Sequence, residues 1–100
     1  MMFPKQKKVV SEKIRQSAAG ESCTLRIEGV CNSRRVTTVL AHLNSKFKGI
    51  SNKSPDVISV YACSDCHRHL DAGKVSSEDQ LRAWQETIMK LIEKELIIIQ

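Results

Sequence analysis

Four cysteines in two pairs are the residues with the clearest chemistry in this 100-residue chain. Cys63 and Cys66 have the spacing of a zinc knuckle, whereas the longer segment between Cys23 and Cys31 must loop out or turn sharply at Gly29. Two cysteine pairs from separate segments can supply the four thiolates of a tetrahedral zinc site and tie those segments together. We therefore predict a structural zinc ion held by all four cysteines.

An even number of cysteines is also compatible with disulfide bonds or with free thiols buried in a core. The first ten residues show no secretory segment, because they contain Lys5, Lys7 and Lys8 and no apolar stretch. Cytoplasmic compartments keep thiols reduced, so we expect a cytoplasmic protein in which zinc is favoured. Both alternatives stay open at this stage.

Two histidines and an aspartate form a second candidate group. His67 directly follows the last cysteine and Asp71 lies four residues later, so both side chains should project from one face of a helix. Such a pair can share a divalent cation, and His42, from a facing strand, could take a proton from water beside it. The simpler interpretations are an ordinary strand histidine and a surface contact on the helix.

The net charge of +5 is unevenly distributed. Residues 1–54 contain 11 Lys or Arg against 3 acids, whereas residues 55–100 contain 5 against 8. A basic half could neutralise a phosphate backbone, although an ordinary solvated surface would give the same composition. Because the chain has only one Trp, one Tyr and two Phe, we expect contacts to phosphates rather than base stacking.

Several short elements must position these groups. Gly20 and Gly73 are natural helix ends, and β-branched or apolar runs favour strands. A run rich in Ser, Asn, Lys and Gly is typical of an exposed loop. The predicted elements are a helix over 11–19, a strand over 24–28, a strand over 35–43, an exposed loop over 44–55, a strand or tight turn over 57–62, and a short helix from 64 to Gly73.

The last predicted helix begins at Ser76 or Ser77, with acidic residues in its first turn. Its apolar residues recur at intervals of three and four, which indicates one apolar stripe: Leu81, Trp84, Ile88, Leu91, Ile92 and Leu96. We expect this stripe to cover the sheet, with a dimer interface as the alternative.

No apolar run is long enough to span a membrane. We predict a basic flexible arm over 1–10 and one domain over 11–100.

The order of these motifs resembles that of the HNH, or ββα-metal, endonucleases. Two cysteines, a histidine that ends a strand, and Cys-x2-Cys followed by a metal ligand succeed one another in both. More closely, the region from Ile14 to Asp71 is similar to the YbcO-like nucleases of lambdoid prophages, through the segments CTLRIEGVCN, VLAHL and PDVISVYACSDCH. The resemblance implies an α+β fold, namely a small zinc-stabilised ββα-metal (HNH-like) domain with a short N-terminal helix and an amphipathic C-terminal helix.

The resemblance also implies a role for each candidate residue. His42 matches the general base that activates water for attack on the scissile phosphate. His67 and Asp71 match the positions that hold the catalytic divalent cation, Mg2+ or another. The four cysteines match the structural zinc ligands.

Two positions depart from the HNH pattern. Ala41 stands where an Asp or His that binds metal commonly precedes the general base. The central asparagine of the HNH motif has no clear counterpart in this chain, and Asp56 or Asn52 could stand in for it.

The favoured hypothesis is a metal-dependent DNA endonuclease of prophage origin, a monomer or homodimer without membrane contact. The alternatives are a non-catalytic zinc-knuckle module that binds nucleic acid in phage recombination or replication, and an adaptor that binds protein through its last helix. His69 lies on another helical face from His67 and is a spectator or a phosphate contact. The residues expected to bind nucleic acid are Arg34, Arg35, Lys46, Lys48 and Lys53.

Overall fold

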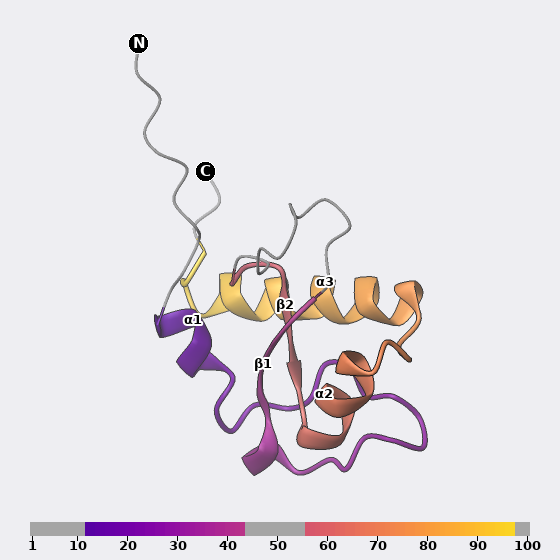
Figure 1. Ribbon diagram of the computed structural model, residues 1–100. Helices are drawn as coiled ribbons and strands as arrows, with labels where there is room; N and C mark the ends of the chain where they lie inside the picture. Colours follow the sequence, from indigo (N-terminus) through magenta and orange to yellow (C-terminus); the bar gives the residue numbers. More distant parts are fainter. Residues whose placement is uncertain (1–11, 44–55, 98–100) are drawn as a thin grey trace.

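The computed structural model describes residues 12–43 and 56–97, which form a small α+β unit (Figure 1). The predicted arm over 1–10, the Ser11 cap and the predicted loop over 44–55, with its three lysines, lie outside these residues. The described elements are α1 (Glu12–Ser17), the 3-10 turn η1 (Arg35–Thr37), β1 (Val39–His42), β2 (Ser59–Ala62), α2 (Ser64–Asp71) and α3 (Ser77–Glu93).

The centre of the fold is an antiparallel pair of strands. Val39 pairs with Ala62 at one end and His42 pairs with Ser59 at the other. All four residues of β2 are buried, so this strand is covered on both faces. The end of β2 leads directly into α2, which turns back beside the strands (Figure 1). The His42 end and the α2 start therefore lie at opposite ends of the pair.

Residues on the two faces of β2 belong to two separate clusters. Val60 and Ala62 pack with the cysteines and with Leu70 of α2. Tyr61, on the opposite face, packs with Ile14 of α1 and Leu91 of α3. Because successive strand residues point to opposite faces, this alternation follows from the pleat of β2.

α3 begins at Ser77, and the hydroxyl of the preceding residue, Ser76, caps the helix by accepting the Asp79 N–H at 3.1 Å. Its buried residues are Ala83, Thr87 and Leu91. Burial of Thr87 is possible because its hydroxyl bonds the Thr24 hydroxyl and the Ala83 carbonyl.

The predicted stripe on α3 is therefore wrong at its start, since Leu81 is 52% exposed. Trp84 and Ile88 pack against the core and Leu91 is buried, as expected. The buried face of α3 therefore differs from the predicted apolar stripe, because the buried face includes the polar Thr87 and the stripe does not.

Two strand predictions also fail, in part or in full. Residues 24–28 form bends and a turn rather than a strand, and Arg26 adopts a positive φ of 43°. The carbonyls of Thr24 and Leu25 accept hydrogen bonds from the Arg82 guanidinium at 2.8 and 2.6 Å, where a strand would have used a neighbouring strand. The second predicted strand covered residues 35–43. In the structure this segment starts with η1, and the strand begins only at Val39.

The turn predicted at Gly29 is confirmed. Its φ is 78°, a value that favours glycine, and the N–H groups of Val30 and Cys31 both donate to the Ile27 carbonyl. This turn brings Cys31 back toward Cys23. None of the described helices combines the length and the apolar character needed to cross a membrane.

Candidate active site and metal centre

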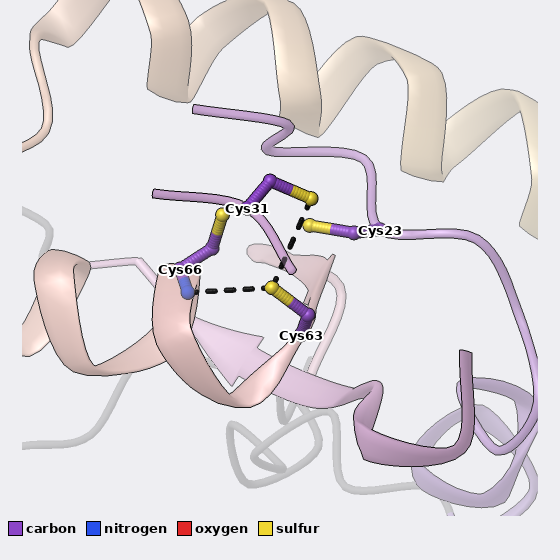
Figure 2. A group of neighbouring side chains, drawn as sticks. All are labelled: Cys23, Cys31, Cys63 and Cys66. Atoms are coloured by element: carbon purple, nitrogen blue, oxygen red, sulfur yellow. Dashed lines mark hydrogen bonds between the residues drawn. The ribbon is translucent and has the colours of Figure 1, made fainter. Parts of the chain in front are cut away.

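The four cysteines converge on one point. Their Sγ atoms all lie within 4.8 Å of one another, and Cys63 Sγ is 3.9 Å from Cys31 Sγ (Figure 2). Sulfurs bound to one zinc at about 2.3 Å in a tetrahedron lie about 3.8 Å apart. The four thiols are free, so the disulfide alternative is wrong. The four predicted ligands thus lie together as a group that could hold a zinc ion.

Backbone N–H groups prepare two of these sulfurs for a metal. Cys63 is the N-cap of α2, and its Sγ accepts the Cys66 N–H at 3.4 Å. Cys23 Sγ accepts the Arg26 N–H at the same distance. Burial acts to raise the pKa of the Cys63 thiol, but hydrogen bonds from the N–H groups of Asn32 and Cys66 outweigh it and lower that pKa. These bonds favour the thiolate form that binds zinc.

Cys66 shows what a cation would contribute to the cysteine group. Its burial, together with the neighbouring sulfurs of Cys23 and Cys63, strongly raises the pKa of its thiol. Thiolates this close and this buried repel one another unless a positive ion lies between them. The chemistry of the donor set therefore fits a structural zinc ion.

Side chains outside the cysteine group connect the segment after Cys31 to the start of α2, which carries Cys66. Asn32, next to Cys31, donates through Nδ2 to Ser64 Oγ at 3.1 Å and to Asp65 Oδ2 at 3.0 Å, at the start of α2. Thr37 Oγ1 accepts the Ser64 N–H at 3.2 Å. These contacts fix α2 against the segment that leads into β1.

His42 lies in a second polar group at the other end of the sheet. Its Nε2 is 2.7 Å from Asp56 Oδ1, and Arg15 Nε of α1 donates to Asp56 Oδ2 at 3.1 Å. Asp56 is 1% exposed, whereas the His42 side chain is 32% exposed. A buried carboxylate thus connects an accessible imidazole to a guanidinium.

This arrangement controls the tautomer of His42. When Nε2–H donates to the Asp56 carboxylate, the lone pair lies on Nδ1, where it can accept a proton. Arg15 Nε in turn donates to the other oxygen of the same carboxylate. The group has the parts of a general base and its orienting partner.

His67 and Asp71 form a third group, on α2. His67 Nε2 is 3.4 Å from Asp71 Oδ2, and the side chains are 36% and 68% exposed. Two ligands about 2.1 Å from one cation lie about 3.0 to 3.4 Å apart, so the pair fits two positions of a coordination shell. In the described part of the chain, the cysteines alone bring three or more such ligands together. Water or substrate oxygens would have to complete a shell on this pair.

His42 and the α2 pair approach the sheet from different faces. Ala41 is 1% exposed and belongs to the cluster that contains Leu70 of α2, so the next residue, His42, points to the opposite face. Among the described residues, no hydrogen bond or ion pair joins His42 to His67 or Asp71.

Sequence reasoning identified Asp56 only as a possible substitute for the missing asparagine, and gave Arg15 no specific role. The one signal for Asp56 was its place as an acid directly before the apolar run of β2. Nothing in the spacing linked it to Arg15, which is 41 residues away.

Comparison with known families decides where this arrangement belongs. The model of the family described as "Putative nuclease YbcO" matches residues 12–95. The chain belongs to the YbcO family. The match includes the cysteine centre, the His42 group and the α2 pair.

Two YbcO relatives share part of the chain. The "Putative nuclease YbcO" of Escherichia coli (strain K12) and that of Enterobacteria phage 82 are each 44% identical over 59 residues. In both cases the match covers 58% of this chain and 62% of the relative, so it spans less than two thirds of their length.

One solved structure is similar to this chain over most of its length. The "Structure of a putative bacteriophage protein from Escherichia coli str. K-12 substr. MG1655" aligns with a TM-score of 0.67 at 33% sequence identity. The alignment covers 83% of this chain and all of that one.

Proposed function

We propose that this YbcO-family chain is a metal-dependent DNA endonuclease of the HNH (ββα-metal) type. The observation that carries the proposal is the 2.7 Å contact between His42 Nε2 and the buried Asp56 carboxylate. The names of the relatives point to nuclease activity, and the order β1, β2, α2 agrees with a ββα-metal unit.

In this proposal His42 is the general base. Its Nδ1 takes a proton from water, the water oxygen attacks phosphorus, and the bond from phosphorus to the sugar oxygen breaks. Asp56 holds the imidazole and stabilises its positive charge, while Arg15 holds Asp56. A positioned general base contributes typically 10²- to 10⁴-fold to a rate.

His67 and Asp71 are the proposed ligands of a divalent cation. Such a cation supplies charge stabilisation for the phosphate and leaving-group oxygens when it is bound. The attacking and leaving oxygens of an in-line displacement lie on opposite sides of phosphorus.

Arg34 and Arg35 are proposed contacts to the DNA backbone. Both are exposed, and Thr37 holds the backbone of η1 by donating through N and Oγ1 to the Arg34 carbonyl. Lys46, Lys48 and Lys53 are proposed to add to the same electrostatic attraction.

The test is cleavage of supercoiled plasmid by the zinc-loaded protein and by His42→Ala, with added Mg2+ or Mn2+. We expect the variant to lose at least about 100-fold in rate. Zinc content and melting temperature, measured on the same samples, should match the unsubstituted protein. Equal cleavage by the two proteins would remove His42 from the mechanism.

A non-catalytic nucleic-acid-binding module is the second candidate, and Ala41 favours it. The Ala41 side chain is buried in the core, so β1 offers no metal ligand beside His42. The pair on α2 then provides two protein ligands. DNA binding that weakens steeply with salt, without Mg2+- or Mn2+-dependent nicking, would select this candidate.

A further inference from the structure

A shallow pocket of about 390 Å³ lies between α2 and the turn at Gly29. One wall is the turn at Gly29 and Val30, and the other carries Asp65, Arg68 and His69 of α2, with Lys74 just beyond the helix. In Figure 1 the segment between the first two cysteines passes beside α2.

The end of α2 holds Lys74 in the pocket wall. Gly73 has a φ of 74°, its N–H donates to the Leu70 carbonyl at 2.9 Å, and the Lys74 N–H donates to the His69 carbonyl at 3.2 Å. These two bonds form a Schellman motif, which turns the chain back over the last turn of the helix. Lys74 is therefore fixed next to His69 by backbone geometry.

The donors around the pocket are suited to an anion. Arg68 and Lys74 are cationic, and the ring of His69 has an N–H donor in either tautomer. The Asp65 carboxylate is already engaged by Asn32 Nδ2 at 3.0 Å and by Arg68 at 3.6 Å. The pocket is thus lined by two cationic side chains, Arg68 and Lys74, and a histidine N–H donor. The one carboxylate in its lining, that of Asp65, already has partners.

The pocket lies on the other side of α2 from the proposed cation pair. His69 is two residues from both His67 and Asp71, which places it about 200° from each around the helix axis. An extended polyanion that lies across α2 could therefore contact both flanks at once.

We propose that this pocket binds a phosphate group of the nucleic acid, away from the one that is cleaved. The inference rests on the proposed function, because it identifies the substrate as a polyanion held on both flanks of α2. Both walls also depend on the cysteine centre, since Val30 directly precedes Cys31 and α2 carries Cys66.

The experiment compares DNA binding by the zinc-loaded full chain with binding by Lys74→Ala and His69→Ala, without added divalent cation. Fluorescence anisotropy of a labelled duplex is measured over a series of salt concentrations. Lys94→Ala is the matched control, because the Lys94 ammonium is engaged by Glu21 at 2.7 Å. We expect Lys74→Ala to weaken binding several-fold and to reduce the salt slope by about 0.9, the value for one phosphate contact.

A second arm identifies the source of the phosphate. Backbone amide signals of Gly29, Val30 and Lys74 are followed by NMR during titration with the duplex or with inorganic phosphate. Shifts with the duplex support the proposal, whether or not free phosphate also shifts these signals. Shifts with inorganic phosphate alone would overturn it and indicate a site for a free anion.

The result can be separated from that for the nuclease. An unchanged salt slope in Lys74→Ala, together with cleavage that still depends on His42, would overturn the pocket and leave the nuclease in place. A reduced slope without any cleavage would support the pocket and overturn the nuclease. If both hold, Lys74→Ala should raise KM several-fold with kcat unchanged.

Discussion

β2 connects two buried polar groups of different chemistry. Cys63 follows its last residue and belongs to a group of four sulfurs, while Asp56 precedes its first residue and contacts Arg15 and His42. The carboxylate has cationic or hydrogen-bonding partners from the protein itself. In the described part of the chain, the sulfurs have backbone N–H donors and one another.

This difference separates a group that could hold a metal ion from a group whose charge is balanced by other side chains of the protein. Buried like groups without a counter-charge are costly, so the cysteine group is stable as thiolates only with a cation. Asp56 is compensated inside the fold, which leaves the accessible side of His42 available for chemistry. The exposed pair on α2, His67 and Asp71, is a third case, and we propose that it holds an exchangeable cation.

The largest expected effect is the loss of zinc. Chelation, or Cys66→Ser, should abolish the cooperative thermal transition, because structural zinc sites contribute roughly 10 to 16 kcal/mol, comparable to the whole stability of a small domain. Circular dichroism melts with zinc analysis provide the measurement. Asp71→Ala is the control and should keep both its zinc and its melting temperature. A Cys66→Ser protein that melts like the unsubstituted one would show that the sulfurs need no ion.

The second prediction concerns the carboxylate group. Asp56→Asn keeps the shape of the side chain but allows its amide to donate to His42 Nε2, which favours the wrong tautomer. We expect kcat to fall by about 10² to 10⁴-fold. Single-turnover cleavage of a labelled duplex measures it. Unchanged kcat would mean that Asp56 holds structure only.

The third prediction concerns the exposed pair. Asp71→Ala removes one of two ligands and should raise the Mg2+ or Mn2+ concentration needed for half-maximal cleavage by about 10 to 100-fold. Cleavage rates are measured across a cation titration, with Glu78→Ala, an exposed acid in the first turn of α3, as control. An identical cation requirement in both variants would remove Asp71 from the cation site.

The smallest effect is expected at Arg15. Its guanidinium is half exposed, and Arg15→Ala leaves Asp56 still bonded to His42. Loss of a hydrogen bond to a buried charge should lower the free energy of unfolding by about 1 to 3 kcal/mol. Urea denaturation measures the change, and Arg26→Ala, which breaks an exposed ion pair with Glu86, should cost less than about 1 kcal/mol. Equal decreases in the free energy of unfolding for the two variants would show that the burial of Asp56 does not strengthen its contact with Arg15.

The sequence predicted what local chemistry determines. The two cysteine pairs, the turn at Gly29 and the short helix after Cys63 depend on residue types and spacing, and all are present. The i, i+4 spacing of His67 and Asp71 also predicted their contact.

Features that depend on long-range contacts were missed. Residues 24–28 alternate as a strand does, but they form bends and a turn, and Arg82 of α3 donates to the carbonyls of Thr24 and Leu25. The buried position of Thr87 depends on the Thr24 hydroxyl, which no periodicity in α3 could indicate. The contact of Arg15 with Asp56 likewise joins residues far apart in the chain.

The most direct test is to measure plasmid cleavage and zinc content on the same samples while free Mn2+ is increased. The account predicts that cleavage rises to a plateau while one zinc per chain stays bound throughout. Cleavage that fails to respond to Mn2+, or that rises only as zinc is displaced, would contradict the assignment of one closed structural site and one exchangeable site.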